Sequence, residues 1–227
     1  MGDLRNRWVA AASSAAGDPA HSATGSSCPE CGEPAQGTRF CTNCGVALVP
    51  VEQLVPAPTG VASPVPDLVP PEAADRFGRY VAAEPGQLWL VSAHGGAGSS
   101  ALGQALGLPA VTRAWPFAPG EPVHVILVCR SNVAGFEAAR LAAREWASGS
   151  LPGVQLHGLA VVADAPGRLP KPLKQLEEHI SGAVPRTWRI GWEERLRVAP
   201  PTPELAQGPW KSLALQVQLL RRQINNE

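Results

Sequence analysis

Short apolar runs alternate with segments of helical periodicity from Gln87 to the C-terminus. This order predicts parallel strands joined by helices, because a parallel pair needs a long crossover connection that usually contains a helix. We expect strands over residues 87–93, 122–130, 154–164 and 184–190, and helices over 99–106, 133–147, 171–180 and 209–226. The predicted fold class is therefore α/β, with a small, mostly parallel sheet of four to five strands and helices on its flanks.

The second and the last of these helices carry apolar stripes at helical spacing. The stripes consist of Phe136, Ala139, Ala143 and Trp146 in the second helix, and of Leu213, Val217, Leu220 and Ile224 in the last. The C-terminal stripe could cover the sheet or pair two chains, and both interpretations stay open. The stretch 108–122 is short and interrupted by prolines, so we expect no pair of strands there.

Composition divides the chain into four parts. Residues 1–25 are small and polar, which predicts a disordered tail. Residues 26–49 contain four of the five cysteines, and residues 50–85 are rich in proline, which predicts a semi-extended linker. Residues 86–227 form the predicted α/β domain with its amphipathic C-terminal helix.

The cysteines of the second part form two matched pairs, Cys28 with Cys31 and Cys41 with Cys44. Two Cys-x-x-Cys turns offer four thiolates to one ion, the tetrahedral set that structural zinc prefers. The alternatives are disulfides or a redox pair, and the lack of a recognisable secretion signal disfavours disulfides. We therefore predict a closed, structural zinc site. Cys129 ends an apolar run and reads as a buried small hydrophobe.

The cysteine stretch "CPECGEPAQGTRFCTNCG" resembles the short zinc ribbon that often stands at the front of bacterial proteins. Ribbons of this kind bind proteins or nucleic acids. The whole chain has 19 Lys plus Arg against 19 Asp plus Glu, and the ribbon has only Arg39 against Glu30 and Glu33. Counterion release therefore gives little affinity for nucleic acid, and we expect protein partners instead.

A glycine-rich turn, "HGGAGSS", lies between the first predicted strand and the first helix. Gly95, Gly96 and Gly98 would let the backbone wrap around an anion at the start of the helix. With its strand, this turn resembles the deviant phosphate loop of MinD/ParA-type ATPases, whose pattern is Lys-Gly-Gly-x-Gly-Lys-Thr/Ser-Thr. The three glycines match that pattern. The resemblance implies bound ATP or GTP with Mg²⁺.

Three positions of the turn decide what the resemblance can imply. Ser100 takes the position of the hydroxyl that would ligate magnesium. His94 stands at the signature lysine and Ser99 at the lysine that would reach the phosphates. Loss of a cation that meets developing phosphoryl charge costs about 10²–10³-fold in rate, so we assign no catalytic residue. The turn is either a structural remnant or a weak nucleotide site built from Gly95, Gly96, Gly98, Ser99, Ser100 and Asp164.

Asp164 ends the third predicted strand, at the edge of a parallel sheet where ligands usually bind. It could hold magnesium, lie near a nucleotide base, or only build the turn that follows. His94, Arg130, Arg168 and Lys171 could form a basic rim beside the glycine turn. The stretches "HGGAG", "EWASG", "ADAPGRLP" and "VPRTWRI" also resemble an actinobacterial family of no assigned function.

These observations predict a cytoplasmic, non-catalytic adaptor that binds zinc and recognises protein partners through the ribbon and the rim of the α/β domain. A nucleotide-binding switch or weak ATPase is the alternative, and nucleic-acid binding through the ribbon is the third hypothesis. No apolar run reaches the ~18 residues needed to span a bilayer, so we expect no membrane partner.

Overall fold

The computed structural model describes residues 27–28, 30–34, 41–43, 48–49, 58–82, 86–208 and 210–226. Its centre is a parallel sheet in the order β3-β2-β5-β6-β7. These strands are β2 (Leu88–Ser92), β3 (Ala110–Thr112), β5 (Val123–Arg130), β6 (Val154–Val162) and β7 (Thr187–Ile190). The predicted α/β class and the small parallel sheet are confirmed.

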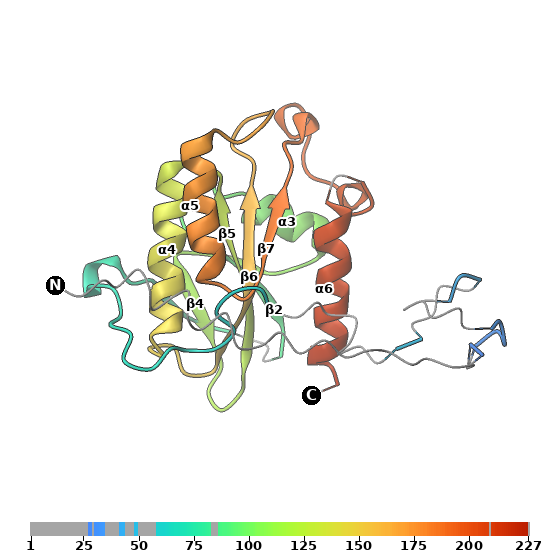
Figure 1. Cartoon of the computed structure of the whole chain (residues 1–227), viewed down its shortest axis with the longest axis horizontal. Coiled ribbons are helices and arrows are strands. Elements are labelled where there is room, and N and C mark those ends of the chain that lie inside the picture. The colour runs from blue at the N-terminus through green and yellow to red at the C-terminus, as the bar shows by residue number, and fades with distance from the viewer. Residues whose placement is uncertain are drawn as a thin grey trace.

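Helices cover both faces of this sheet (Figure 1). On one face lie α4 (Val133–Ala147) and α5 (Lys171–Gly182), and on the other lie α3 (Ser99–Leu106) and α6 (Lys211–Ile224). Short 3₁₀ turns, η3 (Glu194–Arg197) and η4 (Pro203–Ala206), connect β7 to α6. Among the described residues, no helix is long and apolar enough to cross a membrane.

Both apolar stripes face the sheet. In α4 the four predicted residues are buried. In α6, Leu213, Val217 and Leu220 are buried, and Ile224 packs against the same core. Within this chain the C-terminal helix therefore covers the sheet, which is one of the two roles expected for it.

The stretch 108–122 supplies two strands, so the expectation that it could not is wrong. One is β3, at the edge of the main sheet, and the other is β4 (Ala114–Phe117). Arg113 separates them with a φ of 49°. Pro116 is tolerated because, among the described strands, β4 pairs with β1 (Gly78–Val81) alone, so its missing N–H interrupts no central ladder.

The described part of the proline-rich segment, residues 58–82, docks onto the α4 and α5 side of the sheet. The amides of Thr59 and Val65 donate to the carbonyls of Pro185 and Ala147, at 2.8 and 2.7 Å. Val61 and Leu68 pack against the core beneath them. A short 3₁₀ turn, η2 (Ala73–Asp75), and β1 follow. Over these residues the segment is therefore part of the α/β unit, whereas a semi-extended linker was expected up to residue 85.

Glu145 joins this docked segment to α4. Its side chain is buried, and Oε2 accepts from the Phe77 amide at 3.1 Å and from Trp115 Nε1 at 2.9 Å. The Phe77 and Trp115 rings stack with their centroids 5.5 Å apart. One carboxylate oxygen thus satisfies a donor just before β1 and a donor within β4. This contact connects residues 68 positions apart in the chain.

A histidine pair joins β5 to β6. His124 Nδ1 lies 2.9 Å from His157 Nε2, and the two rings stack with centroids 5.2 Å apart. Burial, together with the smaller effects of the nearby charges of His124 and Arg186, lowers the pKa of His157 to about 3. The folded state therefore keeps His157 neutral at pH values where an unfolded histidine is charged.

We predict that Glu145→Ala lowers the free energy of unfolding by about 2–4 kcal/mol, because it leaves two buried donors without an acceptor. Glu145→Gln keeps one acceptor oxygen and should lose less. Glu137→Ala, which removes an exposed ion pair on the same helix, should cost less than about 1 kcal/mol. Urea denaturation of the three variants measures these values, and equal losses at positions 137 and 145 would contradict the assigned role.

We also predict that acid destabilises the fold through His157. Its folded pKa lies below the unfolded value of about 6.5, so its contribution is complete above that pH. As pH falls from 6.5 towards 3, stability should drop by up to about 1.4 kcal/mol per pH unit. His157→Gln should flatten this slope, whatever its effect at neutral pH. Urea denaturation at several pH values compares the two proteins, and parallel slopes would rule out the assignment.

Candidate functional site

Three of the four predicted metal ligands come together near the N-terminus. The Sγ atoms of Cys28, Cys31 and Cys41 all lie within 4.8 Å of one another, and those of Cys31 and Cys41 are 3.5 Å apart. Four thiolates at about 2.3 Å from a tetrahedral zinc would be about 3.8 Å apart. The three thiols therefore have the spacing of a shared metal ion. The fourth predicted ligand, Cys44, lies outside the described residues.

The chain turns tightly around the first cysteine pair. The Cys28 amide donates to the Glu33 carbonyl at 2.8 Å, and the Gly32 amide donates to the Cys28 carbonyl at 2.9 Å. Gly32 has a φ of +74°, a conformation that glycine adopts without the steric cost of a Cβ. Cys28 and Cys41 are buried and Cys31 is exposed. The turn thus places the sulfur atoms of Cys28 and Cys31 on one side of a short loop, close to the sulfur atom of Cys41.

The glycine turn lies at the carboxyl end of β2, where it was predicted. Gly96 and Gly98 have φ values of 75° and 98°, and Gly98 is the N-cap of α3. Within the described part of the chain, no side chain caps the start of this helix. A Cβ on Gly98 would lie 3.4 Å from Val162, so the turn packs against the end of β6, two strands away from β2 in the sheet. The backbone geometry is that of a strand–turn–helix junction able to wrap an anion.

The two serines after the turn point to different environments. Ser99 is buried, and its hydroxyl forms a short hydrogen bond with the buried hydroxyl of Ser92. Ser100 is exposed. The side chain at the position of the phosphate-reaching lysine is therefore directed into the core, beneath the turn.

Two rim residues hold the turn in place through their polar atoms. His94 Nε2 accepts from the Arg130 amide at 3.1 Å, which leaves Nδ1 to donate to the Gly95 carbonyl at 2.8 Å. The Arg130 guanidinium donates from Nε to the Gly96 carbonyl at 3.0 Å and from Nη1 to the Ala163 carbonyl at 2.7 Å. Both side chains thus bond to the backbone of the turn and its surroundings.

The other rim residues do not share these contacts. Asp164 is exposed, and its amide donates to Ser131 Oγ at 3.0 Å. Arg168 and Lys171 are exposed, after a turn in which Gly167 has a φ of 93°. The structure therefore brings His94 and Arg130 to the glycine turn and leaves Arg168 and Lys171 on the surface.

A cleft beside the glycine turn was not identified from the sequence. It encloses about 170 Å³ at the carboxyl ends of β5, β6 and β7. Its walls come from the start of α3, from the strand ends, from residues 191–197 and from Trp210. No sequence motif indicates this cleft, because the segments that form it lie far apart in the sequence.

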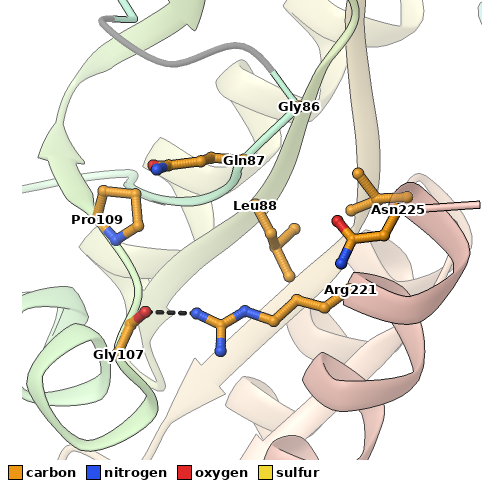
Figure 2. Close-up of a pocket in the computed structure, with 8 residues that line it drawn as sticks. Gly86, Gln87, Leu88, Gly107, Pro109, Arg221 and Asn225 are labelled. Carbon is orange, nitrogen blue, oxygen red and sulfur yellow. Dashed lines mark hydrogen bonds between the residues drawn. The ribbon is translucent and has the colours of Figure 1, made fainter.

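A second hollow lies at the opposite end of the strands, where β2 begins (Figure 2). It encloses about 210 Å³ between the start of β2 and the ends of α3 and α6. The Arg221 guanidinium reaches from α6 to the Gly107 carbonyl and hydrogen-bonds to it. This contact joins the end of α3 to α6 on the same face of the sheet. The position of the Arg221 side chain is therefore explained by a contact within the chain, and no ligand is needed to account for it.

Cys129 is fully buried in β5, as predicted. Burial, together with the smaller effect of the Glu177 charge, raises the pKa of its thiol to about 12. A thiol that stays protonated at neutral pH is a poor nucleophile and a poor metal ligand. Cys129 therefore belongs to the core.

The chain belongs to a family of unknown function (DUF6668), whose model matches residues 86–212. No curated protein and no solved structure matches the chain. The family match begins where the α/β domain was predicted to begin. It supports neither the resemblance to MinD/ParA-type ATPases nor that to zinc ribbons, so both stay hypotheses.

Proposed function

We propose that this chain is a non-catalytic adaptor of the cytoplasm, with a zinc-binding module and an α/β domain that each recognise a protein partner. The observation that carries the proposal is the group of three thiols from Cys28, Cys31 and Cys41, within 4.8 Å of one another. The glycine turn supplies the second argument, because the side chains of His94, Ser99 and Arg130 are hydrogen-bonded within the protein.

Zinc is the metal that fits this donor set. Thiolates are soft ligands, and a closed set of sulfurs favours zinc over the hard cations that oxygen ligands bind. Cys28, Cys31 and Cys41 would hold the ion together with Cys44. With all four positions filled by protein, the ion would order the loops around it and leave no open position for chemistry.

The polar groups at the glycine turn support a structural role for it. Phosphoryl transfer needs cations directed at the transferred group. Here Ser99 bonds to Ser92 in the core, and Arg130 donates to the carbonyls of Gly96 and Ala163. A phosphate would have to draw Arg130 away from bonds that hold the turn together. The turn is therefore better suited to fix α3 on the sheet than to accelerate hydrolysis.

Protein partners fit the charge of the cysteine module better than nucleic acid does. Its described acidic residues, Glu30 and Glu33, are exposed. The described cysteine residues also lie apart from the sheet and its helices (Figure 1). A module placed on a proline-rich connection could engage one partner while the α/β domain engages another, which raises the effective concentration of the second.

A nucleotide-binding switch is the second candidate function. It is favoured by one observation, namely that α3 follows its N-cap Gly98 with no side-chain cap from the described residues, which leaves its first amides for an anion. In that case Gly95, Gly96, Gly98 and Ser100 would contact the phosphates, and Asp164 with Ser100 would hold Mg²⁺.

We predict that the purified chain binds one zinc ion and that Cys31→Ser or Cys44→Ser abolishes tight binding, because each removes one of four thiolates. Cys129→Ala is the matched control and should retain the metal. Elemental analysis after dialysis against a weak chelator measures the zinc content. The thermal unfolding of the α/β domain should be unchanged in Cys31→Ser. Zinc retention by both ligand variants would overturn the assigned site.

We predict no saturable binding of ATP or GTP with Mg²⁺ by calorimetry in the range of tens of micromolar, because two cation positions of the turn are lost. Ser99→Lys should not restore binding, since residue 99 is directed into the core. Gln104→Lys, on the exposed side of the same helix, controls for the added charge. Binding at this affinity by the natural chain would favour the nucleotide switch instead.

A further inference from the structure

The three thiols that come together near the N-terminus differ in their exposure to solvent. Cys28 and Cys41 are buried, with 3% and 5% of their surface accessible, whereas Cys31 is exposed. Oxidants and alkylating reagents act on a sulfur only where they can reach it, so cysteine modification is selective for accessible thiolates. Cys31 is therefore the ligand that a reagent from solution would attack first.

The chain around Cys31 leaves room for a small, uncharged reagent. Gly32 follows it without a side chain, and within the described part of the chain a Cβ built on Gly32 would meet nothing within 4 Å. Glu30 and Glu33 are exposed, and they are the charged members of the described residues of the cysteine module. Two carboxylates repel anions, so these surroundings favour a neutral oxidant such as hydrogen peroxide.

A second thiol lies close enough to react with an oxidised Cys31. The Sγ atoms of Cys31 and Cys41 are 3.5 Å apart. A disulfide bond is about 2.05 Å long, so the two sulfurs need to approach by roughly 1.5 Å. The Sγ atom of Cys28 also lies within 4.8 Å, which makes it the alternative partner that an experiment has to distinguish.

Bound zinc would keep the sulfurs of this module reactive at neutral pH. A metal ion holds its cysteine ligands as thiolates, and the thiolate is the form that attacks peroxide. Cys129 is the contrasting case, because its thiol is buried in the core and stays protonated at neutral pH. Oxidation is therefore directed to the module and away from the α/β domain.

We propose that the zinc site is also a redox site, at which hydrogen peroxide oxidises Cys31 and joins it to Cys41 by a disulfide. The Cys31 thiolate attacks one peroxide oxygen, the O–O bond breaks, and hydroxide leaves a sulfenic acid behind. The Cys41 thiolate attacks that sulfur, the S–O bond breaks, and a second hydroxide leaves as the disulfide forms. The two sulfurs thus give two electrons to the peroxide, and a dithiol reductant reverses the change.

This inference rests on the zinc site proposed above and adds a means of regulating it. The disulfide removes two of the four zinc ligands, so we expect the ion to be released. Because the ion would order the loops around it, its loss should also remove the surface that the module offers to a protein partner. The α/β domain contributes no predicted zinc ligand and should stay folded. Peroxide would therefore switch off one contact of the adaptor and leave the other intact.

The test uses the full chain, loaded with zinc and treated with an equimolar amount of hydrogen peroxide. A colorimetric indicator should record one zinc ion released for each peroxide consumed, and the intact mass should fall by about 2 Da because two thiol hydrogens are lost. Cleavage after glutamate and arginine separates Cys28, Cys31 and the later cysteine pair. Sequencing of the linked fragments should then show Cys31 joined to Cys41.

Matched variants assign the two steps. Cys41→Ser lacks the second thiol, so dimedone should trap the sulfenic acid at Cys31. Cys28→Ser also loses one zinc ligand but keeps both reacting thiols, so it should form the disulfide and give at least about 5-fold less dimedone adduct. Cys129→Ala is the control and should release zinc as the natural chain does. Iodoacetamide should alkylate Cys31 of the zinc-loaded chain about 10-fold faster than Cys28.

The readouts separate this proposal from the zinc site itself. The zinc content before peroxide is added tests the site alone, and a purified chain without zinc would overturn the site and the release of its ion. The redox step is judged by the later measurements. Retention of zinc at equimolar peroxide, a disulfide between Cys31 and Cys28, or equal dimedone adducts in the two ligand variants would each overturn it.

Discussion

The central strand β5 is buried on both faces from Val123 to Cys129, and the rest of the structure depends on covering it. A parallel sheet exposes apolar side chains on two sides, so it must be packed between two layers of helices. On one side α4 and α5 do this together with the docked residues 58–82, and on the other side α3 and α6 do. The glycine turn is the connection that brings α3 back onto the second face. Its tight backbone follows from this packing need, before any ligand is considered.

Much of this arrangement could be predicted from the sequence, because its signals are local. The continuously apolar runs marked β2, β5 and β6, and helical periodicity marked α4 and α6 to within a few residues. The missed strands β1, β3 and β4 are only three or four residues long, and two of them pair outside the main sheet. Such strands form because a partner offers its edge, which composition does not reveal. Likewise, the prolines of residues 58–71 gave no indication of the carbonyls of Ala147 and Pro185 that hold this segment on the domain.

In the candidate sites, too, features with a local sequence signal could be predicted and features that depend on the fold could not. The cysteine pairs could be predicted from spacing alone, because each Cys-x-x-Cys turn is a local structure, and three of the four thiols lie together. The position of the glycine turn was predicted, but the direction of Ser99 was not, since it depends on Ser92 seven residues earlier. The cleft was the feature that the sequence predicted least. Its walls come from α3, from strand ends, from the segment after β7 and from Trp210, and only the fold brings these together.

The contacts of the glycine turn explain how its geometry can persist without a phosphate. In a working phosphate loop, the carbonyls face away from the ligand and lysines meet the charge. Here a small, buried serine replaces one lysine and lets α3 pack directly on β2, while His94 and Arg130 bond to the backbone of the turn itself. Each of these contacts stabilises the empty turn. The same arginine also donates to Ala163 at the end of β6, so one side chain links the turn to a second strand end. A turn fixed by its own side chains can therefore keep its backbone shape without the phosphate that this shape could wrap.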